Sequence, residues 1–239
     1  MENKSTIIVL AIAIILIGGF LYISNSGAIV TAQGTSILKV QPDKVSINLN
    51  IETRGKTSQE AKDLHDEILD KVITNLIKTG LDKDEVKTVN FNIYPDYTYN
   101  DGTRKENGFI AQESLVVETS DFSKVAAIVD ASIEGGALVS YINFELSEEK
   151  QSEFKAKSLE EAGKDARKKA EATASGVDKK LGKLVSVKSQ DFNYGPIMYF
   201  EAGAVKDSAA GAKEAALNIA PKDMEVSATI IVEYRLKSF

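Results

Sequence analysis

Alternation of apolar and polar residues near the start of the chain predicts two neighbouring β-strands. From residue 45 to residue 52 the two kinds of residue alternate strictly, as they do in a strand that buries one face. Residues 29–40 also have the composition of a strand, and Pro42-Asp43 marks a turn between the two segments. We therefore expect these two strands to pair with each other.

More strands are expected in the middle and at the end of the chain. Residues 89–93 alternate, and residues 109–117 mostly resume the alternation after Asp101-Gly102, a dipeptide that is typical of tight hairpin turns. This arrangement predicts an antiparallel hairpin. The remaining strand patterns lie at residues 137–146, 184–187 and 226–236.

Two segments carry apolar residues at helical spacing and begin with residues that cap helices. Thr57 and Glu60 form a capping-box pattern before the first segment, which Gly80 ends. Asp121 is expected to cap the second, which ends at Gly135-Gly136. The two apolar stripes are Ala61, Leu64, Ile68, Val72 and Leu76, then Phe122, Val125, Val129 and Ile133. Because each helix follows a pair of strands, the pattern suggests two β-β-α-like halves.

A long third helix is expected from Glu148 to about Ser175. Alanine occupies every fourth position near its end, at Ala162, Ala166, Ala170 and Ala174. A row of small residues allows a neighbouring backbone to approach closely. Together, the helices and strands predict the α+β class: a largely antiparallel sheet with helices packed on it, two β-β-α-like halves and the long third helix.

The first part of the chain has the length of a membrane span. Residues 7–23 are apolar or glycine apart from Tyr22, and about 20 such residues cross a bilayer. We therefore expect residues 1–27 to contain a transmembrane anchor and a linker. Residues 28–239 are then one globular domain.

The charges beside this segment predict its orientation. Lys4 precedes the apolar run, and the next charged residue is Lys39, so the globular domain is expected outside the cytoplasm of a single-pass membrane protein. A cleaved signal peptide remains the alternative, because Val30 and Ala32 form an acceptable small-residue pair before Gln33. Cleavage there would release a secreted or periplasmic protein, so both readings place the domain outside.

Composition limits the classes of function. With 43% hydrophobic and 27% charged residues, the chain has enough apolar side chains for a core. The absence of cysteine excludes disulfides, thiolate metal sites and cysteine nucleophiles. A formal net charge of −6 argues against nucleic-acid binding, which needs a basic face.

No pattern of residues points to catalysis. His65 is the only histidine, so the chain lacks the ligands of a multi-histidine zinc site, and no Gly-x-Ser-x-Gly elbow or Walker motif occurs. The acids at Asp82, Asp84 and Glu85 do not have the spacing of an EF-hand loop. We therefore expect no catalytic, metal or cofactor-binding residues. His65 is expected on the helix surface, where a substitution costs no more than about 0.5 kcal/mol.

The stretch from residue 191 to residue 222 is expected to be irregular, and it begins with an aromatic segment. Such long connections are often functional. Its side chains either fold back onto the domain's own core or present an apolar surface to another subunit or ligand. Tyr94, Tyr97 and Tyr99 of the predicted hairpin are candidates to join it. Including the alanine-rich helix, the candidate interaction surface comprises Tyr194, Ile197, Met198, Tyr199, Phe200, Ala162, Ala166 and Ala170.

Several short motifs together resemble the SIMPL-domain family. The amino-terminal ones are Pro42-Asp43 before a strand, Glu60-Ala61 at the start of a helix, and Gly135-Gly136-Ala137 before the strand at 142–146. The closing ones are residues 164–170, whose sequence is KDARKKA, then Gly176, Leu181-Gly182 and Val226-Ser227-Ala228. The resemblance spans about residues 34–236. It implies an envelope or periplasmic protein, in some relatives linked to stress tolerance and to ring-like homo-oligomers, and it supplies no catalytic motif.

Two functions follow from these observations. The first is a non-enzymatic, membrane-anchored extracytoplasmic protein that associates with copies of itself, with envelope stress tolerance as the role implied by the resemblance. The second is a monomeric module that binds a peptide, a lipid or a small molecule. The mass of the folded chain in solution distinguishes them.

Overall fold

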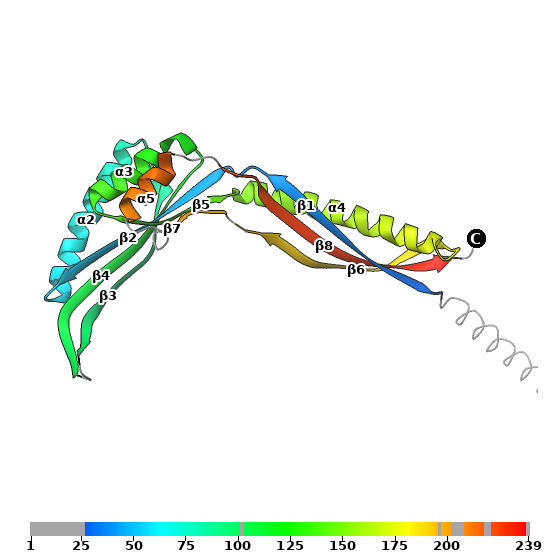
Figure 1. Ribbon diagram of the computed structural model, residues 1–239, viewed down its shortest axis with the longest axis horizontal. Coiled ribbons are helices and arrows are strands. Elements are labelled where there is room, and N and C mark those ends of the chain that lie inside the picture. Colours follow the sequence, from blue (N-terminus) through cyan, green and yellow to red (C-terminus); the bar gives the residue numbers. More distant parts are fainter. Residues whose placement is uncertain (1–26, 101–102, 196, 202–207, 218–220, 238–239) are drawn as a thin grey trace, which may run out of the picture. The chain divides into compact units, whose positions relative to one another are not determined.

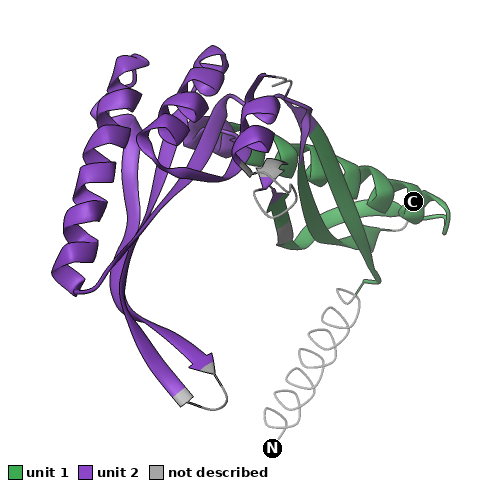
Figure 2. Cartoon of the chain, turned by 60° about the vertical axis from the view of Figure 1, so that its left-hand side comes forward, with its two compact units in different colours: residues 1–38, 153–193, 226–239 green, residues 39–152, 194–225 purple. Residues whose placement is uncertain are grey.

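The computed structural model describes residues 27–100, 103–195, 197–201, 208–217 and 221–237. Its internal contacts divide the chain into two compact units, shown in Figure 2. Unit 1 comprises residues 1–38, 153–193 and 226–239, and unit 2 comprises residues 39–152 and 194–225. Both combine helices with antiparallel strands, so the predicted α+β class is confirmed, whereas the sequence suggested a single domain after residue 27.

Unit 2 is built on a five-stranded sheet with the order β3-β4-β2-β5-β7. Every neighbouring pair in it is antiparallel. The strands are β2 (Lys44–Gly55), β3 (Val86–Asn100), β4 (Thr103–Thr119), β5 (Leu138–Glu145) and β7 (Ile197–Glu201). The predicted hairpin is present as β3 and β4, and its turn at Asp101-Gly102 lies outside the described residues.

Three helices lie on the same side of this sheet in Figure 1: α2 (Ser58–Lys78), α3 (Val125–Gly135) and α5 (Ser208–Leu217). Two short 3-10 turns, η1 (Lys83–Glu85) and η2 (Phe122–Lys124), precede β3 and α3. As the alternation predicted, every second side chain of β2 is apolar and packs against the helices. The core of unit 2 includes Val45, Ile47, Leu49 and Ile51 of β2, Val72 and Leu76 of α2, Ile128 and Val129 of α3, and Ala212 of α5.

The predicted cap of α2 and the predicted end of α3 are confirmed, whereas Asp121 caps the 3-10 turn η2: its Oδ1 atom accepts a hydrogen bond from the Ser123 N–H at 3.0 Å, and α3 begins after Lys124 without a side-chain cap. The Thr57 side chain accepts a hydrogen bond from the Glu60 backbone N–H at 3.1 Å, and the Glu60 carboxylate accepts one from the Lys56 N–H at 2.7 Å. Gly136 ends α3 with a φ of 105°, a left-handed conformation that glycine adopts without steric cost. Local sequence therefore determines where α2 begins and where α3 ends.

Unit 1 contains a three-stranded sheet with the order β1-β8-β6 and the helix α4 (Glu148–Ser175) packed against it. The strands are β1 (Ile29–Val40), β8 (Met224–Lys237) and β6 (Lys180–Tyr194). The alanine row of α4 is buried among apolar side chains of β1 and β8. A Cβ atom at Gly34 would overlap backbone atoms of Ala162 and Ala166, so the close backbone approach expected for this row is present.

Two predictions about the strands are wrong. β1 does not pair with β2; it pairs with β8, which comes almost 200 residues later, and β2 lies between β4 and β5 in the other sheet. The stretch at 191–222 is not one irregular loop, because it contains the end of β6, then β7 and α5. Both errors concern pairing between distant segments, which local alternation does not encode.

The apolar segment at residues 7–23, predicted to be a membrane anchor, lies outside the described residues. Within the part of the chain that the structure describes, no helix is both long enough and apolar enough to cross a membrane.

Candidate functional site

The five-stranded sheet of unit 2 has two different faces. One face packs against α2, α3 and α5 and is apolar. Side chains alternate between the faces along each strand, so the register of pairing places the polar positions of β2, beginning with Lys44 and Ser46, on the opposite face. We call this second surface the open face.

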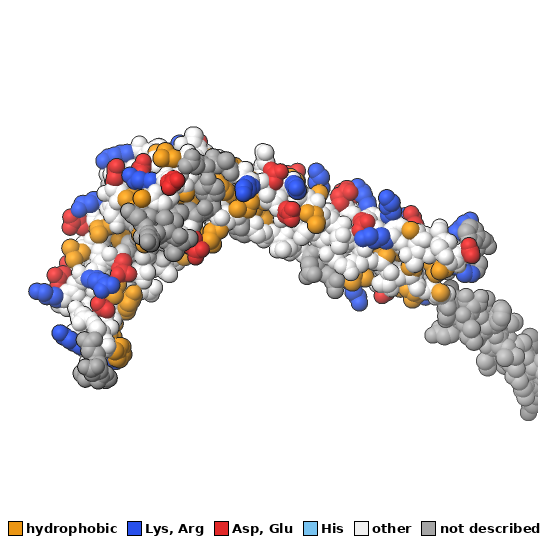
Figure 3. All heavy atoms as spheres, in the orientation of Figure 1, with side chains coloured by type: hydrophobic (Ala, Val, Ile, Leu, Met, Phe, Trp, Pro, Cys, Tyr) orange, Lys and Arg blue, Asp and Glu red, His pale blue; other side chains and the backbone are white. Residues whose placement is uncertain are grey.

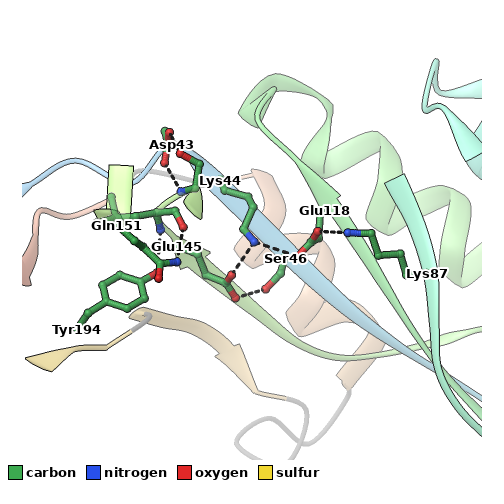
Figure 4. A network of polar contacts seen from close by, with 10 residues as sticks. Asp43, Lys44, Ser46, Lys87, Glu118, Glu145, Gln151 and Tyr194 are labelled. Carbon is green, nitrogen blue, oxygen red and sulfur yellow. Dashed lines mark hydrogen bonds and ion pairs between the residues drawn. The ribbon is translucent and has the colours of Figure 1, made fainter. Parts of the chain in front are cut away.

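A cluster of ion pairs lies at one end of the open face (Figure 4). The Lys44 Nζ atom is 2.9 Å from Oε1 of Glu118 and 3.1 Å from Oε2 of Glu145. Lys87 reaches the other oxygen of Glu118 at 2.7 Å, and the Ser46 hydroxyl donates to Glu145 at 2.7 Å. Acids and bases in this cluster are therefore paired with one another.

These contacts determine the charge of the cluster. Hydrogen bonds from Lys87 and then from Lys44 hold the pKa of Glu118 below its ordinary value. Partial burial by itself would lower the pKa of Lys44, but hydrogen bonds to Glu118 and Glu145 leave it raised. Lys44 and Glu118 are thus charged at neutral pH, and the cluster ties β2 to β3, β4 and β5.

A second set of contacts fixes the turn before β2. The Asp43 carboxylate accepts hydrogen bonds from the backbone N–H and from the hydroxyl of Ser147, both at 2.8 Å. The Leu146 N–H donates to the Tyr194 hydroxyl at 2.8 Å, while the Gln151 side chain donates to the Leu146 carbonyl. A shallow cavity of about 200 Å³ adjoins Asp43, Lys44 and Glu118. Because the acids beside it are already paired, we assign the set a structural role.

His65 does not lie on the helix surface, so that prediction is wrong. Its side chain is 1% exposed. The Nε2 atom lies 3.0 Å from Oε2 of Glu113, but the geometry is not that of a hydrogen bond. Glu113 is also buried and accepts a hydrogen bond from Thr88 at 2.7 Å. The Phe91 ring lies 4.9 Å from the imidazole, centroid to centroid. His65 therefore joins α2 to β3 and β4 in the interior.

The sequence contained a signal for this buried pair. Glu113 lies between Ala111 and Leu115 at a position whose side chain faces the helices, so the predicted strand carries a carboxylate among its inward positions. A buried carboxylate needs a partner. The only histidine of the chain, at the edge of the apolar stripe of the helix, was available for that role.

The middle of the open face carries amides and hydroxyls. Charged side chains lie at its two ends, in the Lys44 cluster and around Arg54, which pairs with Glu52 and Asp96 at 3.1 and 3.3 Å. The polar residues between them form what we call the amide face: Asn48, Asn50, Asn90, Asn92, Gln112, Ser114, Tyr141 and Asn143. Val116, Leu138 and Met198 lie on the same face among them.

The edge strand β3 exposes several apolar side chains. It is 15 residues long, and among the strands that the structure describes it pairs only with β4. Val89 is 62% exposed and Tyr99 is 69% exposed, with Phe91 and Tyr94 at 40% each. Register shifts in its pairing with β4 occur near Val89 and again after Asp96.

The residues predicted as an interaction surface lie in different environments within the described part of the chain. Ala162, Ala166 and Ala170 are buried within unit 1, so they belong to its core and offer no free surface. Tyr194 is half-buried and accepts the Leu146 hydrogen bond. On β7, Ile197 packs against the core of unit 2, whereas Met198 is 56% exposed. The side chains of Tyr199 and Phe200 lie outside the described part of the chain.

Charges of both signs are mixed on the molecular surface. Figure 3 shows lysine and arginine side chains interspersed with acidic ones along α4. Several of these are paired one turn apart, including Arg167 with Glu171 at 2.9 Å and Lys169 with Asp165 at 2.6 Å. Among the residues that the structure describes, no group of three or more histidine or acidic side chains has an arrangement that could hold a metal ion.

The architecture defines a class: a protein of two α+β units, in one of which a polar cluster links the strands of the sheet. The chain belongs to the SIMPL family, described as "Protein of unknown function (DUF541)", whose model matches residues 30–234. The family resemblance predicted from the sequence is thereby confirmed.

Curated relatives come from bacteria. The chain is 26% identical over 170 residues to "Uncharacterized protein YggE" of Escherichia coli strain K12, covering 71% of this chain and 69% of that protein. It is 29% identical over 112 residues to the "26 kDa periplasmic immunogenic protein" of Brucella melitensis, covering 45% of each. The YggE protein of Edwardsiella ictaluri is 25% identical over 171 residues, 71% of each chain.

Proposed function

We propose that this chain is a non-enzymatic, extracytoplasmic protein that associates with copies of itself through the edge strand β3. The observation that carries the proposal is the length of this edge and its exposed apolar side chains, Val89 above all. A long apolar edge strand is a template for pairing with another chain. The homo-oligomers implied by the family resemblance point in the same direction.

The sequence of β3 suits pairing between identical strands. From Val89 to Pro95 it carries no charge, so two copies placed antiparallel about a twofold axis bring no like charges together. Pro95 has no N–H to donate and limits the shared ladder to the residues before it. Such a contact would continue the sheet of unit 2 into that of the second copy.

Lysine substitutions at exposed valines test the association. Val89→Lys adds a charge to each of the two facing strands and should dissociate the oligomer, whereas Val187→Lys, at a valine of β6 that is 54% exposed, is the matched control. The masses of the full-length chain and its two variants would be measured in detergent by sedimentation or native mass spectrometry. A monomeric parent chain, or equal effects of both substitutions, would refute association through β3.

A monomeric parent chain would favour the second candidate, a binding module. The observation that favours this alternative is the amide face, which presents several hydrogen-bonding side chains beside one another.

The proposed location rests on two observations. The apolar run at residues 7–23 has the length of a membrane span, and the Brucella relative is described as periplasmic. We infer that the run anchors the chain and that the following residues lie outside the cytoplasm. Protease added to spheroplasts should digest the protein, and the mature chain should begin at Met1 or at residue 2. A mature chain that begins at Gln33 would show that the segment is cleaved.

A further inference from the structure

One end of unit 1 brings together segments that are far apart in the sequence. The carboxyl end of α4, the start of β1 and the end of β8 lie there in Figure 1. The Leu236 N–H donates to the Ala28 carbonyl at 2.7 Å, which joins β8 to the residue before β1. A Cβ atom at Gly182 would lie 2.5 Å from the Arg235 carbonyl oxygen, so the start of β6 lies at the same end. We call this region the proximal end: residues 27–29, 175–183 and 234–237.

The proximal end is basic, although the chain as a whole has a formal net charge of −6. The dipole of α4 favours a lysine just beyond its carboxyl end, which accounts for Lys179. Lys183 and Lys237 belong to strands, so the dipole does not account for them. The charged residues of the proximal end are one acid, Asp178, and the bases Lys179, Lys180, Lys183, Arg235 and Lys237.

Exposed apolar side chains accompany these cations. Val177 is 55% exposed and Ile29 is 53% exposed. The turn that carries Val177 is held by hydrogen bonds from the Val177 and Lys179 N–H groups to the Ala174 carbonyl, at 3.2 and 3.0 Å. Apolar side chains beside lysine and arginine are typical of surfaces that bind at the interface of an anionic membrane.

The length of the chain limits how far the proximal end can lie from a membrane that holds the apolar run. This run ends at residue 23, and Ala28 is already bonded to β8. A fully extended chain between these two residues spans at most about 18 Å. Lipid headgroups occupy roughly 5–7 Å of that distance. The headgroups are therefore within reach of the proximal end at the high effective concentration of a tethered partner, an advantage that a soluble acidic protein lacks.

We propose that the proximal end of unit 1 docks on anionic lipid headgroups of the membrane that holds the chain. The inference rests on the proposed anchoring by residues 7–23. It is independent of association through β3, because β3 belongs to unit 2. Each lysine or arginine near an anionic surface strengthens the attachment roughly fivefold.

A single fluorescent label measures the docking. Because the chain has no cysteine, a fluorophore can be attached through Ser175→Cys alone, at an exposed position of the proximal end. The labelled full-length chain would be reconstituted into vesicles of phosphatidylcholine, or of equal parts phosphatidylcholine and phosphatidylglycerol. Both would contain a small fraction of lipid with a nitroxide on its headgroup, which quenches a fluorophore that lies close to it. We expect stronger quenching in the anionic vesicles and loss of the difference at about 1 M salt, where the Debye length is about 3 Å.

Paired substitutions test whether the cations of the proximal end are responsible. Lys183→Gln together with Lys237→Gln should lower the ratio of docked to undocked chains roughly 25-fold in the anionic vesicles. Lys157→Gln together with Lys188→Gln is the matched control, because it removes the same charge from exposed positions of unit 1. Lys157 lies about 27 Å from Ser175 along α4, and Lys188 lies about 26 Å from Lys180 along β6, so the control should leave the quenching unchanged.

Flotation of the vesicles distinguishes failure of the anchor from failure of the docking. A chain that does not float with neutral vesicles lacks the anchor, which would overturn both proposals. A chain that floats but is quenched equally in neutral and anionic vesicles would overturn the docking alone. Equal effects of the two pairs of substitutions would also overturn it, once far-UV circular dichroism shows that both variants are folded.

Discussion

Replacing His65 by alanine should destabilise unit 2 strongly. The imidazole is 1% exposed and lies between Glu113 and the ring of Phe91, so its removal leaves both a void and a buried carboxylate without its neighbour. The sequence alone suggested a surface histidine and a cost below about 0.5 kcal/mol. The two expectations differ enough for one measurement to decide between them.

The magnitude follows from the two contacts. Loss of the aromatic contact with Phe91 costs about 0.5–1.5 kcal/mol. Leaving the Glu113 carboxylate without a partner on one oxygen costs about 1–3 kcal/mol more, while Thr88 continues to donate to the other oxygen. We therefore expect a loss of about 1.5–4.5 kcal/mol in the free energy of unfolding, a large part of the total for most domains.

Urea unfolding followed by far-UV circular dichroism measures this loss. Thr74→Ala is the matched control, because Thr74 is an exposed residue of the same helix and its substitution should cost less than about 0.5 kcal/mol. Adding Glu113→Gln to His65→Ala should recover part of the loss, because an unpaired amide is less costly than an unpaired carboxylate. A cost for His65→Ala equal to that of the control would refute the reasoning, as would strict additivity of the two substitutions.

Three further outcomes are expected from the same unfolding assay. Gly34→Ala should destabilise unit 1 by about 3 kcal/mol, since the added Cβ meets the backbone of Ala162; a neutral effect would contradict the close packing. Thr57→Ala should cost about 1 kcal/mol through loss of the α2 cap, and Thr57→Ser should cost much less. Stability should fall as pH drops below about 4.3, the ordinary pKa of a glutamate, because the pKa of Glu118 is lowered in the folded state. Protonation of Glu118 breaks its pairs with both lysines, so Glu118→Gln should make stability depend less on pH in this range.

The features predicted well from the sequence depend on nearby residues. The limits of α4, the cap at Thr57 and the end of α3 at Gly136 follow from local side-chain and backbone preferences, and all three are present. The inward positions of β2 follow from the two-residue period of a strand. These signals span only a few residues, which is why the sequence contains them.

The features that were missed depend on contacts between distant segments. Pro42-Asp43 suggested a hairpin, but the Asp43 carboxylate instead binds Ser147, and β1 leaves to join β8. The alanine row predicted close packing correctly; what it could not indicate is that the neighbour is β1 of the same chain, approaching at Gly34. The amide face was missed because its asparagines come from β2, β3 and β5, and only the strand order brings them together.

The position of β8 affects the order in which the chain can fold. This last strand lies between β1 and β6, so the sheet of unit 1 has no centre until β8 is available. Residues 39–152 of unit 2, by contrast, are continuous and include four of its five strands. Synthesis from the amino terminus therefore favours early folding of unit 2. A nascent chain that ends before residue 224 carries β1 and the alanine row of α4 without the strand that joins β1 to β6, and premature termination there would leave unit 1 unfolded.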